Sequence, residues 1–288
     1  KIKFTEPFTN LFTGGMVCHE SYRDPNNNWL YPYEVEKINP SSFIKKDDKS
    51  KVIVGPSESM SKSKKNTIDP EIMIEQYGAD SVRWFILSDS PPEKDVQWSN
   101  TGVSSANKFL QKIWNLNFII SKQVNKNLNT KTKEEFDTKI SNYANKIDNA
   151  IKAFRFNVAI AHFYEVYKLF KDNLDNKQNK QTLTNNMILV MKLMIPFTPH
   201  LAYECLELLN CKTSDKWPKI DKKNISELIK FAVQINGKTR DVLEIENNLK
   251  ENEINKIVLK KSKAGKYLKD KKVTKTIFIN NKIINYII

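Results

Sequence analysis

Glycine, proline and cysteine are scarce in this 288-residue chain, and each scarcity excludes a class of protein. Seven glycines and 11 prolines are too few for a collagen-like or low-complexity chain. The three cysteines, Cys18, Cys205 and Cys211, form no Cys-x-x-Cys pair and are too few for a disulfide framework. We therefore expect reduced thiols, no metal site and a cytoplasmic protein.

Long hydrophobic runs are also missing. The most apolar stretch, residues 187–195, is interrupted by Lys192 and followed by Pro196, so we expect a buried helix and no membrane span. Acidic residues are outnumbered, with 33 Asp+Glu against 47 Lys+Arg and a net charge of +14. This excess favours a polyanionic partner, with nucleic acid first. It does not identify RNA by itself, because AT-rich genomes also raise the lysine and asparagine content of proteins.

The residue patterns predict a multidomain α+β protein with three regions. Residues 1–98 read as short strands followed by two helices. Residues 99–215 carry apolar side chains at three- and four-residue spacings, which predicts a bundle of four or five helices. Residues 226–288 alternate on both sides of the turn pairs 236–237 and 280–281, which predicts a small α/β domain with two hairpins.

A polar loop at residues 60–64, Met-Ser-Lys-Ser-Lys, follows a predicted strand at residues 51–54. Asp69 is expected to cap a helix that opens with Pro70, as Asn157 is expected to cap a helix of the bundle. Lysine is a compact cation on a flexible stem, so it can follow a phosphate that moves during a reaction. Serine hydroxyls and loop N–H groups add neutral donors to the same anion. From these residues alone, the loop reads equally as a polyphosphate-binding loop or as a solvated lysine loop.

The loop resembles the second signature of class I aminoacyl-tRNA synthetases, Lys-Met-Ser-Lys-Ser, and residues 65–70 and 76–85 continue the resemblance. In this chain the signature loop consists of Ser59, Met60, Ser61, Lys62 and Ser63. Serine thus replaces the family's first lysine. The resemblance implies that Lys62 is the catalytic cation on the ATP phosphates and that Ser61 and Ser63 bind ATP beside it. It also implies that Lys64 adds a positive field without a fixed contact.

The C-terminal region resembles the synthetases of one substrate amino acid. Residues 233–240, Val-Gln-Ile-Asn-Gly-Lys-Thr-Arg, resemble the compact C-terminal domain of leucyl-tRNA synthetases of the bacterial and organellar type, and residues 265–268 and 277–279 continue the match. The resemblance implies three domains: the end of a Rossmann-type catalytic domain at 1–98, an anticodon-binding-type bundle at 99–215 and a tRNA-binding domain at 226–288.

The resemblance further implies an ATP-dependent leucine–tRNA ligase, which makes leucyl adenylate and transfers leucine to the 3′ terminal adenosine of tRNA(Leu). The implied partners are leucine, ATP with Mg²⁺ as its counter-ion, and tRNA(Leu), and the full-length enzyme is expected to be a monomer. None of the three histidines stands in the His-x-Gly-His arrangement of the first class I signature. We expect that signature and the editing insertion upstream of Lys1, and we expect the fragment alone to be inactive. Two alternatives stay open: a synthetase for isoleucine, valine or methionine, and a non-catalytic RNA-binding module descended from a synthetase.

Four residues are candidates for contact with tRNA. Asn236, Lys238 and Arg240 lie at or beside the predicted Asn-Gly turn, where cations can reach RNA phosphates. Arg83 lies on the helix that follows the signature loop, where it either contacts tRNA or pairs with Asp80.

Overall fold

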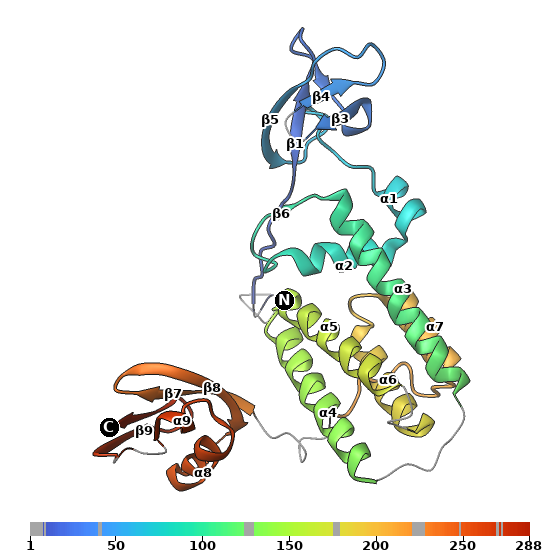
Figure 1. Ribbon diagram of the computed structural model, residues 1–288. Coiled ribbons are helices and arrows are strands. Elements are labelled where there is room, and N and C mark those ends of the chain that lie inside the picture. The colour runs from blue at the N-terminus through green and yellow to red at the C-terminus, as the bar shows by residue number, and fades with distance from the viewer. Residues whose placement is uncertain are drawn as a thin grey trace, which may run out of the picture. The chain divides into compact units, whose positions relative to one another are not determined.

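The computed structural model describes residues 8, 10–39, 42–123, 130–174, 179–220, 228–247, 249–268, 271 and 273–288. The chain forms two compact units, residues 1–220 and residues 221–288 (Figure 1). Both units contain helices and strands, which confirms the predicted mixed content. The division into three domains stays a prediction, and the predicted start of the third, residues 226–227, lies outside the described residues. No described helix is long and apolar enough to cross a membrane.

The first unit opens with a small sheet that leads the chain to the signature loop. Its strands follow the order β2-β1-β5, and a further strand, β6, pairs with β1 in parallel. The antiparallel β1–β5 pair aligns Cys18 with Ser59 and His19 with Glu58. The strands are β1 (Val17–Arg23), β2 (Trp29–Leu30), β5 (Ile53–Ser59) and β6 (Val96–Gln97).

A second, two-stranded sheet lies in the same part of the first unit. It consists of β3 (Val35–Asn39) and β4 (Ser42–Lys45), and it follows a short 3-10 helix at Pro32–Glu34. A small buried cluster joins the two sheets through the side chains of Tyr22, Leu30, Val35 and Val52.

The signature loop joins β5 to helix α1 (Pro70–Tyr77). Strand β5 runs on to Ser59, past its predicted end, so the loop starts directly at a strand terminus. Asp69 caps α1 as predicted, because its carboxylate accepts a hydrogen bond from Glu71 N at 2.9 Å. Helix α2 (Ala79–Asp89) follows after one residue and leads toward the bundle.

The predicted helical bundle holds the main hydrophobic core. Trp84 of α2 is fully buried there, and the rings of Phe109, Phe163 and Phe197 lie 5.4 to 6.2 Å from it between centroids. Cys205 lies in the same core, and burial raises the pKa of its thiol to about 12, so the thiol stays protonated at neutral pH. The helices are α3 (Asn100–Lys122), α4 (Thr130–Lys152), α5 (Phe156–Asn173), α6 (Lys180–Met194) and α7 (Pro199–Leu208).

One predicted helix cap in the bundle is wrong. Helix α5 begins directly after Arg155, so Asn157 lies inside its first turn and caps nothing. The chain enters α5 through a tight turn in which Phe154 has a φ of +56°, and this turn sets the helix start earlier than the cap residue suggests. Asn179 instead caps α6, where its Oδ1 accepts a hydrogen bond from Thr182 N at 2.8 Å.

The second unit is a four-stranded sheet in the order β8-β7-β10-β9. Both predicted hairpins are present, β7 with β8 and β9 with β10, and β10 pairs with β7 in parallel between them. Apolar side chains of helix α8 share one buried cluster with alternate residues of β7, so this helix covers one sheet face. The elements are β7 (Leu228–Ile235), β8 (Lys238–Glu246), α8 (Glu251–Lys261), α9 (Gly265–Leu268), β9 (Lys275–Ile279) and β10 (Ile283–Ile287).

Candidate functional site

The signature loop leaves the sheet at the end of β5 and folds into a turn over residues 62–65. Met60 N donates to Val17 O at 3.1 Å, which continues the β1–β5 pairing by one step. Lys65 N donates to Lys62 O at 3.3 Å and closes the turn, with Lys65 at a φ of +53°. The predicted loop residues therefore lie in one short segment whose course is tied to β1.

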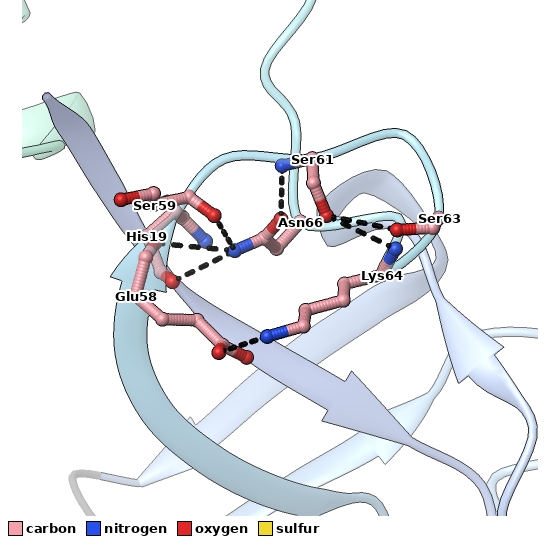
Figure 2. A network of polar contacts seen from close by, with 7 residues as sticks. All are labelled: His19, Glu58, Ser59, Ser61, Ser63, Lys64 and Asn66. Carbon is pink, nitrogen blue, oxygen red and sulfur yellow. Dashed lines mark hydrogen bonds and ion pairs between the residues drawn. The ribbon is translucent and has the colours of Figure 1, made fainter.

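The side chain of Asn66 holds this segment from within. It is fully buried, and its Oδ1 accepts a hydrogen bond from Ser61 N at 2.8 Å. Its Nδ2 lies within hydrogen-bonding distance of three carbonyl oxygens, those of His19, Glu58 and Ser59, at 3.2 to 3.4 Å. Figure 2 shows the amide at the centre of these contacts. One neutral side chain thus connects the loop to both β1 and β5.

The three lysines of the turn have different surroundings. Lys64 Nζ forms an ion pair with Glu58 Oε2, and the hydrogen bond from this ammonium lowers the pKa of the Glu58 carboxyl below its usual value. The prediction that Lys64 makes no fixed contact is therefore wrong. Lys65 Nζ lies 5.1 Å from the ring centroid of Tyr31, in a cation–π contact. Lys62 is exposed, and within the described residues its ammonium has no hydrogen bond or ion pair, so it is free to bind an external anion.

The serine hydroxyls order the turn around these lysines. Ser61 Oγ and Ser63 Oγ lie 3.2 Å apart, and Lys64 N donates to Ser61 Oγ at 3.4 Å. Ser63 is exposed, so its hydroxyl is accessible to an anion that reaches Lys62. Ser59 is exposed as well, at the last position of β5.

A cavity of about 380 Å³ lies next to the loop, over the β1–β5 pair. Arg23 lines it, and the guanidinium carbon of this residue lies 3.8 Å from the ring centroid of Trp29. The paired side chains of Glu58 and Lys64 line it as well. The predicted ATP-binding residues 61–63 do not line it, so this cavity is not the predicted phosphate-binding surface. The described part of the chain contains no group of three His, Cys, Asp or Glu side chains placed to hold a metal ion.

Arg83 has internal hydrogen-bond partners in the bundle. Its Nε donates to Phe197 O at 3.1 Å, and its Nη2 donates to Pro196 O at 2.5 Å. The carboxylate of Asp80 accepts a hydrogen bond from Leu201 N at 2.7 Å instead of pairing with Arg83. The predicted pairing of Arg83 with Asp80 is therefore wrong, and both side chains fasten α2 to the start of α7. Contact of Arg83 with tRNA stays a prediction.

The turn of the first hairpin in the second unit is held by side-chain amides. Asn236 and Gly237 have φ values of +49° and +76°, as a type I′ turn requires. Gly237 N donates to Asn285 Oδ1 at 3.0 Å, and Ile288 N donates to Asn236 Oδ1 at 3.1 Å. The Asn236 side chain therefore already serves the fold of the turn and the chain end.

The two cations beside this turn differ in their contacts. The guanidinium carbon of Arg240 lies 4.9 Å from the ring centroid of Tyr267. Lys238 is exposed, and its ammonium has no hydrogen bond or ion pair to any residue that the structure describes. Their roles in tRNA binding stay predictions.

Sequence reasoning did not single out two residues that flank the loop, Asn66 and Glu58. Glu58 is the one acidic residue in the segment 57–65, and an isolated carboxylate before a run of lysines is a visible signal for an ion pair. Asn66 had no such signal, because its importance arises from three backbone carbonyls that the β1–β5 pairing brings together.

Two family descriptions match parts of the chain. Residues 49–99, which contain the signature loop and helices α1 and α2, match the class I tRNA synthetases for I, L, M and V. Residues 133–256 match the anticodon-binding domain of tRNA ligases.

Similar proteins match over the whole chain. Leucine–tRNA ligases of Orientia tsutsugamushi, Rickettsia bellii and Zymomonas mobilis are 40%, 38% and 33% identical over 100%, 99% and 100% of this chain. The chain spans about a third of each, namely 34%, 34% and 33%. A LeuRS of Agrobacterium radiobacter, solved as a ternary LeuRS–tRNA–LeuAMS complex, has a TM-score of 0.63 and 25% identity over 80% of this chain and 31% of its own. Along its whole length, the chain is therefore a homologue of one part of the leucine–tRNA ligases, which are class I aminoacyl-tRNA synthetases.

Proposed function

We propose that this chain works as the part of a leucine–tRNA ligase that binds the phosphates of ATP and contacts tRNA. The observation that carries the proposal is the exposed, unpaired ammonium of Lys62 on a loop whose other lysines are occupied. A fixed loop with one available cation suits an anion whose charge redistributes during a reaction. The whole-chain similarity to leucine–tRNA ligases supports leucine as the amino acid.

The reaction has two steps. A carboxylate oxygen of leucine attacks the α-phosphorus of ATP, the bond to the β-phosphate oxygen breaks, and pyrophosphate leaves. A hydroxyl of the 3′ terminal adenosine of tRNA then attacks the leucyl carbonyl carbon and loses its proton, the bond from that carbon to the phosphate oxygen breaks, and AMP leaves with the electron pair. Both steps need charge stabilisation and positioning more than a covalent side chain. Lys62 would stabilise the charge that develops on the pyrophosphate oxygens, and the hydroxyls of Ser61 and Ser63 would add neutral hydrogen bonds.

Magnesium would enter with ATP as its counter-ion. Mg²⁺ commonly binds through substrate phosphates, water and one or two carboxylates. Glu58, a carboxylate of the loop region, is already paired with Lys64, and the described residues offer no three-ligand group. The residues present therefore fit a magnesium ion held mainly by the nucleotide, whose chemistry is to neutralise phosphate charge.

The second proposed partner is tRNA(Leu). The net charge of +14 favours a polyanion, and Lys238 lies exposed beside the hairpin turn of the second unit. Arg83 is a further candidate, since its side chain remains exposed although it binds two carbonyls.

We also propose that the full-length enzyme is a cytoplasmic monomer.

Amino-acid-dependent ATP–pyrophosphate exchange tests this function in the full-length protein that contains the chain. Leucine should support exchange, whereas isoleucine, valine and methionine should not at the same concentration. Exchange with one of those three would assign the chain to another synthetase of the subclass. A protein that binds tRNA but shows no exchange with any of the four amino acids would be a non-catalytic module, and the proposal would be wrong.

A further inference from the structure

The segment that carries Lys62 has little hydrophobic support. No residue of the segment 59–66 belongs to a described hydrophobic cluster, and Lys62 and Ser63 are exposed. Polar contacts therefore decide the course of this segment. Besides the Met60 N–Val17 O hydrogen bond and the Lys64–Glu58 ion pair, those that connect it to the sheet are made by Asn66, the one side chain in the segment that is fully buried (Figure 2).

The contacts of Asn66 act directly on the residues around Lys62. Its Oδ1 binds Ser61 N, one residue before Lys62, and its Nδ2 faces the carbonyls of Glu58 and Ser59 at the end of β5. The turn closes on the other side through Lys65 N and Lys62 O. The backbone of Lys62 is thus fixed from both directions, while its side chain stays free.

Only a neutral amide satisfies this position. One atom must accept a hydrogen bond from an N–H group, and the other must donate to a cluster of carbonyl oxygens. An aspartate of the same shape would keep the acceptor and place a buried carboxylate against three carbonyl oxygens. A carboxylate here would also add negative charge next to a site for polyphosphate.

We propose that Asn66 is a positioning residue for Lys62: its buried amide fixes the loop so that the Lys62 ammonium is presented to the ATP phosphates without an internal partner. The inference rests on the proposed function, since it names how the same site is held. A preorganised cation stabilises a transition state without reorganisation at the moment of reaction, so loss of the amide should act on kcat more than on the KM for ATP.

A double-mutant cycle in the full-length enzyme tests the inference, with leucine-dependent pyrophosphate exchange as the readout. Asn66→Ala should lower kcat by about 10- to 100-fold and change the KM for ATP by less than about threefold. In a Lys62→Ala background, the same change should cost less than about threefold further, because the residue acts through Lys62. Losses that multiply would overturn the proposal.

Asn117→Ala is the matched control. Asn117 is also a fully buried asparagine whose Nδ2 donates to a backbone carbonyl, that of Cys205 at 3.2 Å, and it lies in the bundle core. Its replacement should lower thermal stability, and its effect on kcat should multiply with that of Lys62→Ala. Equal coupling of Asn117 and Asn66 to Lys62 would mean that the coupling reports general destabilisation, which would also overturn the proposal.

Two further measurements test the inference even if a variant folds poorly or activity is absent. Asn66→Asp, the isosteric change, should lose at least as much kcat as Asn66→Ala, and wild-type kcat in it would contradict the donor role. Hydrogen exchange of the Ser61 amide should accelerate in Asn66→Ala, and unchanged protection would refute the contact without any reference to activity. If the Ser61 amide is protected from hydrogen exchange in the wild-type enzyme but the enzyme catalyses no pyrophosphate exchange, the proposed function would be refuted instead.

Discussion

The signature loop and the hairpin turn of the second unit each present an exposed lysine from a backbone that an asparagine side chain fixes. Each is a short polar segment that carries an exposed lysine, Lys62 in one and Lys238 in the other. Each is also fixed by an asparagine side chain that binds backbone N–H groups, Asn66 in the loop and Asn236 at the turn. The difference is depth: the Asn66 amide is fully buried, whereas Asn236 is exposed.

We propose that this difference separates a catalytic cation, Lys62, from a binding cation, Lys238. A buried amide with several partners holds the backbone of Lys62 rigidly, as transition-state stabilisation requires. An exposed turn with single hydrogen bonds tolerates small movements, which suffices for attraction to a phosphate backbone. In both segments a second cation is occupied, Lys64 by Glu58 and Arg240 by the ring of Tyr267. On this proposal the exposed lysine, rather than the number of cations, marks the contact with a phosphate.

The largest expected effect is the loss of activity on replacing Lys62, and its absence would contradict the comparison between the two segments. Lys62→Ala in the full-length enzyme should slow leucine-dependent pyrophosphate exchange by about a hundredfold, because one preorganised donor to the transition state is lost. Lys238→Ala, the same change in the other segment, should leave exchange unchanged. The measurement is the exchange rate at saturating ATP and leucine. A Lys62→Ala rate within about threefold of wild type would refute its catalytic role.

The reverse experiment concerns tRNA. Lys238→Ala should reduce the slope of log K against log salt for tRNA binding by about one counterion, because an unpaired ammonium is available to a phosphate. Arg240→Ala should reduce it less, since this guanidinium is already engaged with Tyr267. Filter binding at several salt concentrations measures both slopes. Lys256→Ala removes an equal charge from the exposed side of α8 and serves as the control; an equal slope change there would mean diffuse attraction without a specific role for the turn.

Local patterns were sufficient where one residue type decides the structure. Asp69 and its proline gave the start of α1, and Asn236–Gly237 gave the hairpin, because few residues cap a helix or adopt a positive φ. The prediction that Asn157 caps a helix was wrong because asparagine also occurs inside helices, and here the preceding turn determines where α5 begins. Sequence patterns thus located the elements better than their ends.

Contacts between distant segments were not predictable in the same way. The two carbonyls that Arg83 binds lie in the segment before α7, and one of the partners of Asn66 lies on β1, so both sets of contacts depend on how elements pack. Arg83 and Asp80 are three residues apart on one helix, a spacing that permits an ion pair. Arg83 instead binds two carbonyls of the turn before α7, and Asp80 binds Leu201 N and the His200 ring within α7. The resemblance to a family located the loop, and only the fold showed which of its lysines is free.

A smaller effect is expected from the backbone of the hairpin turn. Gly237→Ala should destabilise the second unit by about 1 kcal/mol, since alanine is strained at a φ of +76°. No atom lies within 4 Å of the added Cβ, so the cost comes from the backbone alone. Thermal unfolding should show a fall of roughly 4–8 °C in the transition of this unit. Lys282→Ala, in the exposed turn of the other hairpin, is the control with an expected change below about 0.5 kcal/mol, and an equal fall there would refute the argument.

The smallest expected effect concerns Ser59, the position at which the loop departs from the family signature. Ser59 is exposed at the end of β5, next to the segment that Asn66 holds, so a longer cationic side chain can be accommodated there without repacking. Ser59→Lys should lower the KM for ATP by less than about tenfold, or about 1.4 kcal/mol, as one exposed charge in water contributes little. Ser59→Gln adds length without charge and should leave the KM unchanged. A decrease in the KM for ATP that fades as ionic strength rises would identify the added charge as its cause, whereas equal values for the lysine and glutamine variants would mean that this position does not contact the nucleotide.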